Sequence, residues 1–153
     1  AVGYATMDGD TAGGVSPLAG IDKAFLLKWL VWMGKDFPAL AAAARLTPSP
    51  ELRPRSRKQT SEGDLMPYDV LDAIERSFIR DKRSPEETLV ALAGMFPAHP
   101  KEKLEGWVRR FYSLWTRNQW KRERYAPSFH LDDESLDPRG WCRFPILSVE
   151  FPA

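Results

Sequence analysis

The chain has 153 residues, a length typical of one domain, with 43% hydrophobic and 28% charged residues, as in an ordinary globular protein. Its formal net charge of +1 excludes a global electrostatic field that would recruit nucleic acid or an acidic membrane. Cys142 is the one cysteine, which excludes an intramolecular disulfide and a thiolate zinc site. The sequence shows neither an apolar run of membrane-spanning length nor a signal-peptide pattern, so we expect a soluble, cytoplasmic protein.

The first residues carry the one pattern that predicts a β-strand. Val2-Gly3-Tyr4-Ala5-Thr6 is a short run of this type, and nothing later in the chain alternates convincingly. A single strand is unstable in water, so its partners should lie in another part of a larger α/β unit. We therefore expect a mostly α chain with at most a short N-terminal strand.

The remainder predicts a series of helices separated by proline-containing breaks. Asp22 can cap a helix that stops at Gly34, and apolar residues on most of its sides predict burial on more than one face. Ser84 opens a capping box for another helix. The expected helices span residues 23–33, 39–46, 67–81, 84–95 and 100–124, and residues 128–153 are expected to form an irregular tail.

Residues 47–66 predict a long loop, because Pro48, Pro50 and Pro54 oppose regular structure. Loops of this length are usually functional or disordered. Ser49 and the basic residues that follow it could close over a polyphosphate as a mobile lid. A solvated basic loop explains the same residues equally simply.

Two lysines near helix ends are candidates for anion binding. Lys23 lies at an expected helix start, where backbone N–H groups attract anions, although a solvated lysine is the simpler alternative. Lys121, with Trp120 beside it, ends the last helix and could bind a carboxylate or carbonyl oxygen, although cations are favoured there anyway. Asp8 and Asp10 could contact magnesium or a ribose, or be ordinary turn residues.

Five segments match one known family, in the order that the family has them. They are G-Y-A-T-M-D-G-D-T-A-G-G (3–14), D-K-A-F (22–25), T-P-S-P-E-L-R-P (47–54), Q-T-S-E-G-D-L-M-P-Y-D-V-L-D-A-I (59–74) and W-K-R-E-R-Y-A-P (120–127). The chain resembles the C-terminal part of the NAD synthetase domain, in the glutamine-dependent form of that family. The resemblance covers nearly the whole chain, residues 1–153.

The resemblance implies a ligase that makes NAD from deamido-NAD, ATP and ammonia through an acyl-adenylate. An upstream amidase domain releases the ammonia from glutamine, and ATP acts with Mg²⁺ in a homo-oligomeric full-length enzyme. The implied fold is an ATP-pyrophosphatase-like (adenine nucleotide α-hydrolase-like) α/β domain, with residues 47–66 as its lid loop. Because the S-G-G-x-D-S ATP loop and the amidase precede this part in the family, we expect an inactive fragment that holds no cofactor tightly.

The resemblance also assigns site residues by position. Lys23 and Ser49 match residues that bind ATP, whereas Lys121, with Trp120 beside it, matches a lysine that binds the nicotinate end of deamido-NAD. Asp10 lies near the same site. Neither a catalytic residue nor a metal ligand is assigned. The identification predicts that Lys23 and Lys121 are buried and converge on one dinucleotide pocket.

Two other functions remain open from the residues alone. One is a helical interaction domain without a ligand site. The other is a helical nucleic-acid-binding module, whose affinity would fall steeply with salt. It would use Arg109, Arg110, Arg117, Lys121, Arg122 and Arg124. The aromatic residues Trp107, Phe111 and Trp115 share one helical stripe and favour a core instead. We expect neither nucleic acid nor a membrane as a partner.

Overall fold

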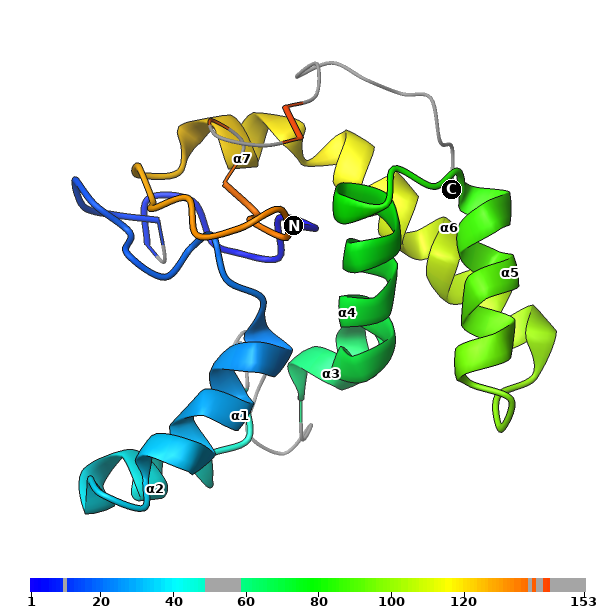
Figure 1. Cartoon of the computed structure of the whole chain (residues 1–153). Helices are drawn as coiled ribbons and strands as arrows, with labels where there is room; N and C mark the ends of the chain where they lie inside the picture. Colours follow the sequence, from blue (N-terminus) through cyan, green and yellow to red (C-terminus); the bar gives the residue numbers. More distant parts are fainter. Residues whose placement is uncertain (10, 49–58, 138, 140–141, 144–153) are drawn as a thin grey trace.

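The computed structural model describes residues 1–9, 11–48, 59–137, 139 and 142–143. These residues form helices and connecting loops, and none of them lies in a β-strand. In Figure 1, α1 and α2 form a hairpin on one side of the molecule, and α4, α5 and α6 pack together on the other. The prediction of a mostly helical chain is confirmed.

Helix α1 begins at the predicted cap, but the α1–α2 hairpin is less buried than expected. Helix α1 (Lys23–Met33) begins at Asp22, whose Oδ1 accepts a 2.6 Å bond from Phe25 N, and ends at Gly34. Helix α2 (Pro38–Ala44) replaces the predicted 39–46 helix. Within α1 only Ala24 is buried, so the prediction of burial on several faces is wrong. The reason is that α1 makes its main helix contacts with α2 and α4, which leave the rest of its surface exposed.

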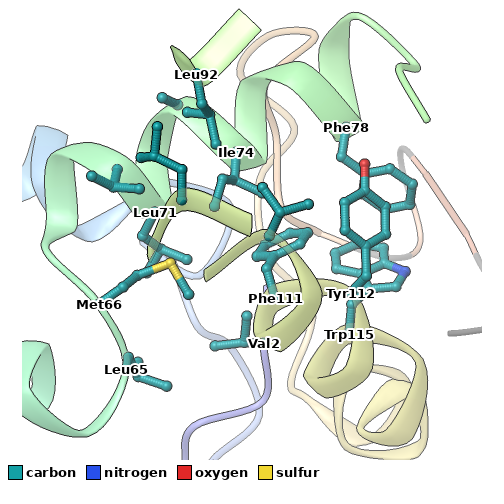
Figure 2. Packing of buried hydrophobic residues seen from close by; sticks show 14 of the residues in the cluster. Val2, Leu65, Met66, Leu71, Ile74, Phe78, Leu92, Phe111, Tyr112 and Trp115 are labelled. Carbon is teal, nitrogen blue, oxygen red and sulfur yellow. The ribbon is translucent and has the colours of Figure 1, made fainter. Parts of the chain in front are cut away.

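The hydrophobic core lies between α4, α5 and α6, and Figure 2 shows its side chains. Helix α4 spans Tyr68–Glu75 and continues into the π-helix η1 (Arg76–Arg80). Helix α5 spans Pro85–Met95 and begins with the predicted Ser84 capping box, and α6 spans Lys101–Arg117. Phe78 packs edge-on against Tyr112 and Trp115, with ring centroids 4.9 and 5.0 Å apart. Such aromatic pairs stabilise a core beyond their buried area.

Two of the predicted helices are divided. The 67–81 helix changes from α to π geometry at Arg76, while the 100–124 helix breaks at Asn118 and resumes as α7 (Gln119–Arg124). The predicted 47–66 loop contains one helical turn, α3 (Ser61–Asp64). The described residues from 128 onward have turns and bends without a helix, and the irregular tail expected over 128–153 stays a prediction.

The prediction of a strand at residues 2–6 is wrong. Gly3 has φ +65°, which is left-handed backbone and incompatible with a strand. The carbonyl groups of this segment accept bonds from side chains of Asn118 and Lys121 instead of from a neighbouring strand. Val2 is buried in the core cluster, so the segment is anchored by packing as well.

Among the helices that the structure describes, none combines the length and the apolar character that a bilayer crossing requires.

Candidate functional site

The first part of the candidate site is the junction between the N-terminal segment and the break after α6. Lys121 Nζ donates to the carbonyl oxygens of Gly3 and Ala5, both at 3.1 Å. Asn118 Nδ2 donates to the carbonyl oxygen of Val2 at 2.8 Å. Side chains from the helix break and the first turn of α7 therefore hold the N-terminal segment in place.

An aromatic ring and two cations extend this junction toward solvent. Lys121 Nζ lies 5.7 Å from the centroid of the Trp120 ring, and Arg124 Cζ lies 6.0 Å from the same centroid. Arg124 also makes an exposed 3.2 Å ion pair with Asp8. A partly exposed ring between two cations suits a planar, anionic ligand. Asp10, which was predicted to lie near this site, is outside the described residues, as is Ser49.

The second part is a cavity of about 270 Å³, which lies between the N-terminal segment, the start of α1, one face of α4 and the residues after α7. Lys23 lines this cavity, and its ammonium group lies 5.7 Å from the centroid of the Tyr68 ring. Lys121 is absent from the described lining, although Gly3, to which it bonds, belongs to that lining. Lys23 is exposed and Lys121 is half-buried, so the prediction that both lysines are buried is wrong. Their convergence on one dinucleotide pocket stays a prediction.

Four buried ionisable side chains also line the cavity: Asp72, Glu75, Arg122 and Asp137. Burial raises the pKa of Glu75 to about 7 and that of Asp72 to about 6, with repulsion from Asp22 as a further cause. Burial lowers the pKa of Arg122 to about 10. Arg122 Nη1 donates to Gln119 Oε1 at 2.7 Å and Nη2 to the Leu136 carbonyl at 3.1 Å. Perturbed acids and bases in one cavity are typical of functional sites.

Sequence reasoning missed Asn118, Asp72 and Glu75. A signal for the two acids is present, because they lie three residues apart on the face of α4 that also carries Leu71. An acidic residue on a buried helix face needs a partner or a ligand. No comparable signal exists for Asn118, since its role depends on a segment more than a hundred positions away.

The basic residues proposed for nucleic-acid binding do not form one free surface. Arg122 is 4% exposed, Arg110 donates to the Asp64 carbonyl oxygen, and Arg109 pairs with Glu105. Trp115, expected in the core, is fully buried there. The described side chains also provide no group of three or more His, Cys, Asp or Glu residues that could hold a metal ion.

The helices and the junction define a mostly helical protein that resembles part of one known enzyme. The model of the NAD synthase family matches residues 1–124. The glutamine-dependent NAD(+) synthetase of Xylella fastidiosa (strain Temecula1) is 33% identical over 152 residues, covering 97% of this chain and 25% of the relative. That of Synechocystis sp. is 29% identical over 153 residues, covering 99% and 25%. The crystal structure of a glutamine-dependent NAD(+) synthetase from Cytophaga hutchinsonii matches with a TM-score of 0.77 and 47% identity, over 97% of this chain and 22% of that chain.

The chain belongs to the NAD synthase family. It spans about a quarter of the length of the relatives it matches. The family predicted from the five sequence motifs is confirmed, together with its glutamine-dependent form. The individual residue roles stay predictions.

Proposed function

We propose that this chain is the substrate-binding C-terminal part of a glutamine-dependent NAD synthetase. In the complete enzyme, an ATP-dependent ligase would amidate deamido-NAD to NAD through an acyl-adenylate, using ammonia from an upstream amidase. The parent domain would be an ATP-pyrophosphatase-like α/β unit, assembled as a homo-oligomer. Family membership supports the reaction class, and the share of the relatives that the chain spans supports its role as one part.

The observation that carries this proposal is the contact between Lys121 and the N-terminal segment. These residues come from the first and the last of the five family motifs, and Lys121 Nζ lies 3.1 Å from two carbonyl oxygens of the first motif. A half-buried ammonium group beside the Trp120 ring is suited to a nicotinate carboxylate, because the ring can stack and the cation can pair. We therefore assign the nicotinate end of deamido-NAD to this junction.

Lys23 would contribute to ATP binding at the other side of the N-terminal segment. It is the first residue of α1, and its exposed ammonium group lies beside a helix N-terminus, where phosphate groups are favoured. Ser49, in the proposed 47–66 lid, would add a hydroxyl group to the same phosphates. The Mg²⁺ that acts with ATP would be bound in the complete enzyme, together with the phosphate groups.

Titration calorimetry with deamido-NAD tests the assignment directly. We expect saturable binding that Lys121→Ala weakens at least tenfold, since the variant removes the ammonium group that pairs with the carboxylate. Lys101→Ala is a matched control, because Lys101 is exposed at the start of α6. Equal affinities of the three proteins for deamido-NAD would overturn the role of Lys121. With ATP, ammonia and deamido-NAD the chain alone should form no NAD, and turnover would contradict the fragment proposal.

A further inference from the structure

The cavity beside α4 contains a buried carboxylate without a hydrogen-bond partner among the described residues, although the α-amino group of Ala1 and the Arg122 guanidinium lie near enough to attract it. Glu75 is 7% exposed and lines the cavity, and none of the described residues makes a hydrogen bond or an ion pair with its side chain. A buried, unpaired carboxylate is strongly unfavourable unless it is protonated or binds a partner. The function proposed above makes no use of Glu75.

Three further carboxylates line the same cavity; Asp137 Oδ1 accepts a 3.0 Å bond from Arg139 N, and the carboxylates of Asp72 and Asp22 are only partly engaged. One oxygen of Asp72 pairs with Arg76 at 3.0 Å, and Oδ1 of Asp22 caps α1. Their repulsion adds to the burial that raises the pKa of Glu75 to about 7. A cation inside the cavity would relieve the burial cost and the repulsion together.

The two side-chain cations that line the cavity make their contacts with groups other than Glu75, although Arg122 Nε has no hydrogen-bond partner among the described residues. The Lys23 ammonium group lies over the Tyr68 ring, at 5.7 Å from its centroid. Arg122 stacks on Trp115, with Cζ 3.8 Å from the ring centroid, and donates to Gln119 and to a backbone carbonyl. Neither cation makes an ion pair with Glu75. The α-amino group of Ala1 also lines the cavity and attracts the Glu75 carboxylate, but it makes no hydrogen bond or ion pair with it, so Glu75 is free to accept a hydrogen bond from a cationic ligand.

The other lining residues indicate which kind of cation the cavity would bind. Ile21, Leu65 and Leu71 line the cavity with aliphatic groups. The carboxylates do not form a cluster that could hold a metal ion, within the part of the chain that the structure describes. An ammonium group spans wider spacings between its acceptors, and an attached aliphatic chain would cover the apolar wall.

We propose that this cavity binds a primary ammonium group on a short aliphatic chain, with Glu75 as the principal acceptor. The volume of about 270 Å³ is near the lower end for ligand pockets, which fits a small aliphatic amine. The same chemistry occurs in a free alkylamine and in the side chain of a lysine from another polypeptide segment. This proposal is independent of NAD synthesis.

The proposal implies a definite pH dependence. Glu75 must be ionised to pair with the amine, and alkylamines remain protonated up to a pH of about 10. Binding should therefore strengthen between pH 6 and pH 8, as the Glu75 proton is lost. The other charged groups that face the cavity are the α-amino group of Ala1, Asp22, Lys23, Asp72, Arg122 and Asp137. Burial lowers the pKa of the Ala1 amino group, which favours its neutral form and weakens its competition for Glu75.

Titration of the chain with n-butylamine at pH 8 tests the site, with n-butanol as the uncharged probe. We expect saturable amine binding, and an affinity at least tenfold lower in Glu75→Gln, which preserves the shape of the side chain. Asp69→Asn is the matched control, because Asp69 is an exposed acid on the same helix and does not line the cavity. Far-UV circular dichroism and urea unfolding verify that each variant folds.

Further titrations identify the source of the amine and test whether binding takes place inside the cavity. Binding of N-acetyl-lysine methylamide together with n-butylamine would assign the site to a lysine side chain, whereas binding of n-butylamine alone would assign it to a free amine. Ala24→Leu fills the cavity from α1 and should weaken both amines, whereas acetylation of Ala1 should leave them bound. Absence of saturable binding, or equal affinity in Glu75→Gln, would overturn the proposal and leave a cavity that holds water.

Discussion

Gly3 and Asn118 lie so close together that no side chain fits between them. A Cβ atom added to Gly3 would lie 2.5 Å from Asn118 Cβ, and Gly3 has φ +65°. The same asparagine donates a 2.8 Å bond to the carbonyl oxygen of Val2. The close approach and the hydrogen bond together fix the N-terminal segment against the helix break, and this position sets where Lys121 finds its carbonyl partners.

Gly3→Ala should destabilise the protein by about 1–3 kcal/mol, because a side chain at positive φ is strained and its Cβ overlaps Asn118. Urea unfolding followed by tryptophan fluorescence measures the free energy of unfolding. Gly94→Ala is the control, since a Cβ at Gly94 meets nothing within 4 Å and alanine favours the interior of α5. If Gly3→Ala and Gly94→Ala had the same free energy of unfolding, the close approach of Gly3 to Asn118 would not contribute to stability.

Lys121→Met should release the N-terminal segment, since it keeps an apolar side chain but removes the donor to Gly3 and Ala5. We expect a loss of about 1 kcal/mol in the free energy of unfolding, because the half-buried bonds compete with water. Amide hydrogen exchange should accelerate in residues 2–6 and remain unchanged in α5. Lys101→Met, at an exposed position on α6, should change neither measurement.

Local sequence signals were sufficient for the helices with strong caps. Asp22 and Ser84 accept the hydrogen bonds that their positions predict, because capping depends on neighbours within three residues. The break at Asn118 was not predictable, because it is coupled to a contact with residues at the other end of the sequence. The exposure of the aromatic residues on α1 was not predictable either. Periodicity shows that a helix face is apolar, but it does not show which part of the protein covers that face.

The candidate site was predictable only through the family motifs. Lys121 and Trp120 lie together as the motif order suggested, whereas the bonds from Lys121 to backbone carbonyls have no signal in the sequence. Glu75 was missed because a single acid on an amphipathic helix resembles an ordinary surface residue until its burial is known. The roles of Lys23, Lys121 and Trp120 remain predictions from the motifs, as do those of Ser49 and Asp10, which lie outside the described residues.

Ile74→Ala tests whether the core between α4 and α6 determines stability. Ile74 is fully buried, so its truncation should cost about 2–5 kcal/mol through lost burial and a residual cavity. Val90→Ala, at a position on α5 that is 76% exposed, should change the free energy of unfolding by less than about 0.5 kcal/mol. Equal urea midpoints for the two variants would mean that the helices do not share a packed core.

The raised pKa of Glu75 makes stability depend on pH in a direction opposite to that of most carboxylates. Burial raises this pKa from an ordinary value of 4.5 to about 7, so the folded state binds the proton more tightly than the unfolded state. The contribution of Glu75 to folding is therefore complete below pH 4.5 and is lost as the pH rises to 7, at a cost of about 3 kcal/mol.

Glu75→Gln should remove this loss, so that the variant gains stability over the parent between pH 5 and pH 7.5 in urea unfolding. Asp69→Asn controls for the change in net charge, because Asp69 is exposed on the same helix. A parent and a Glu75→Gln variant whose stabilities run parallel across this pH range would show that Glu75 titrates as an ordinary, solvated acid.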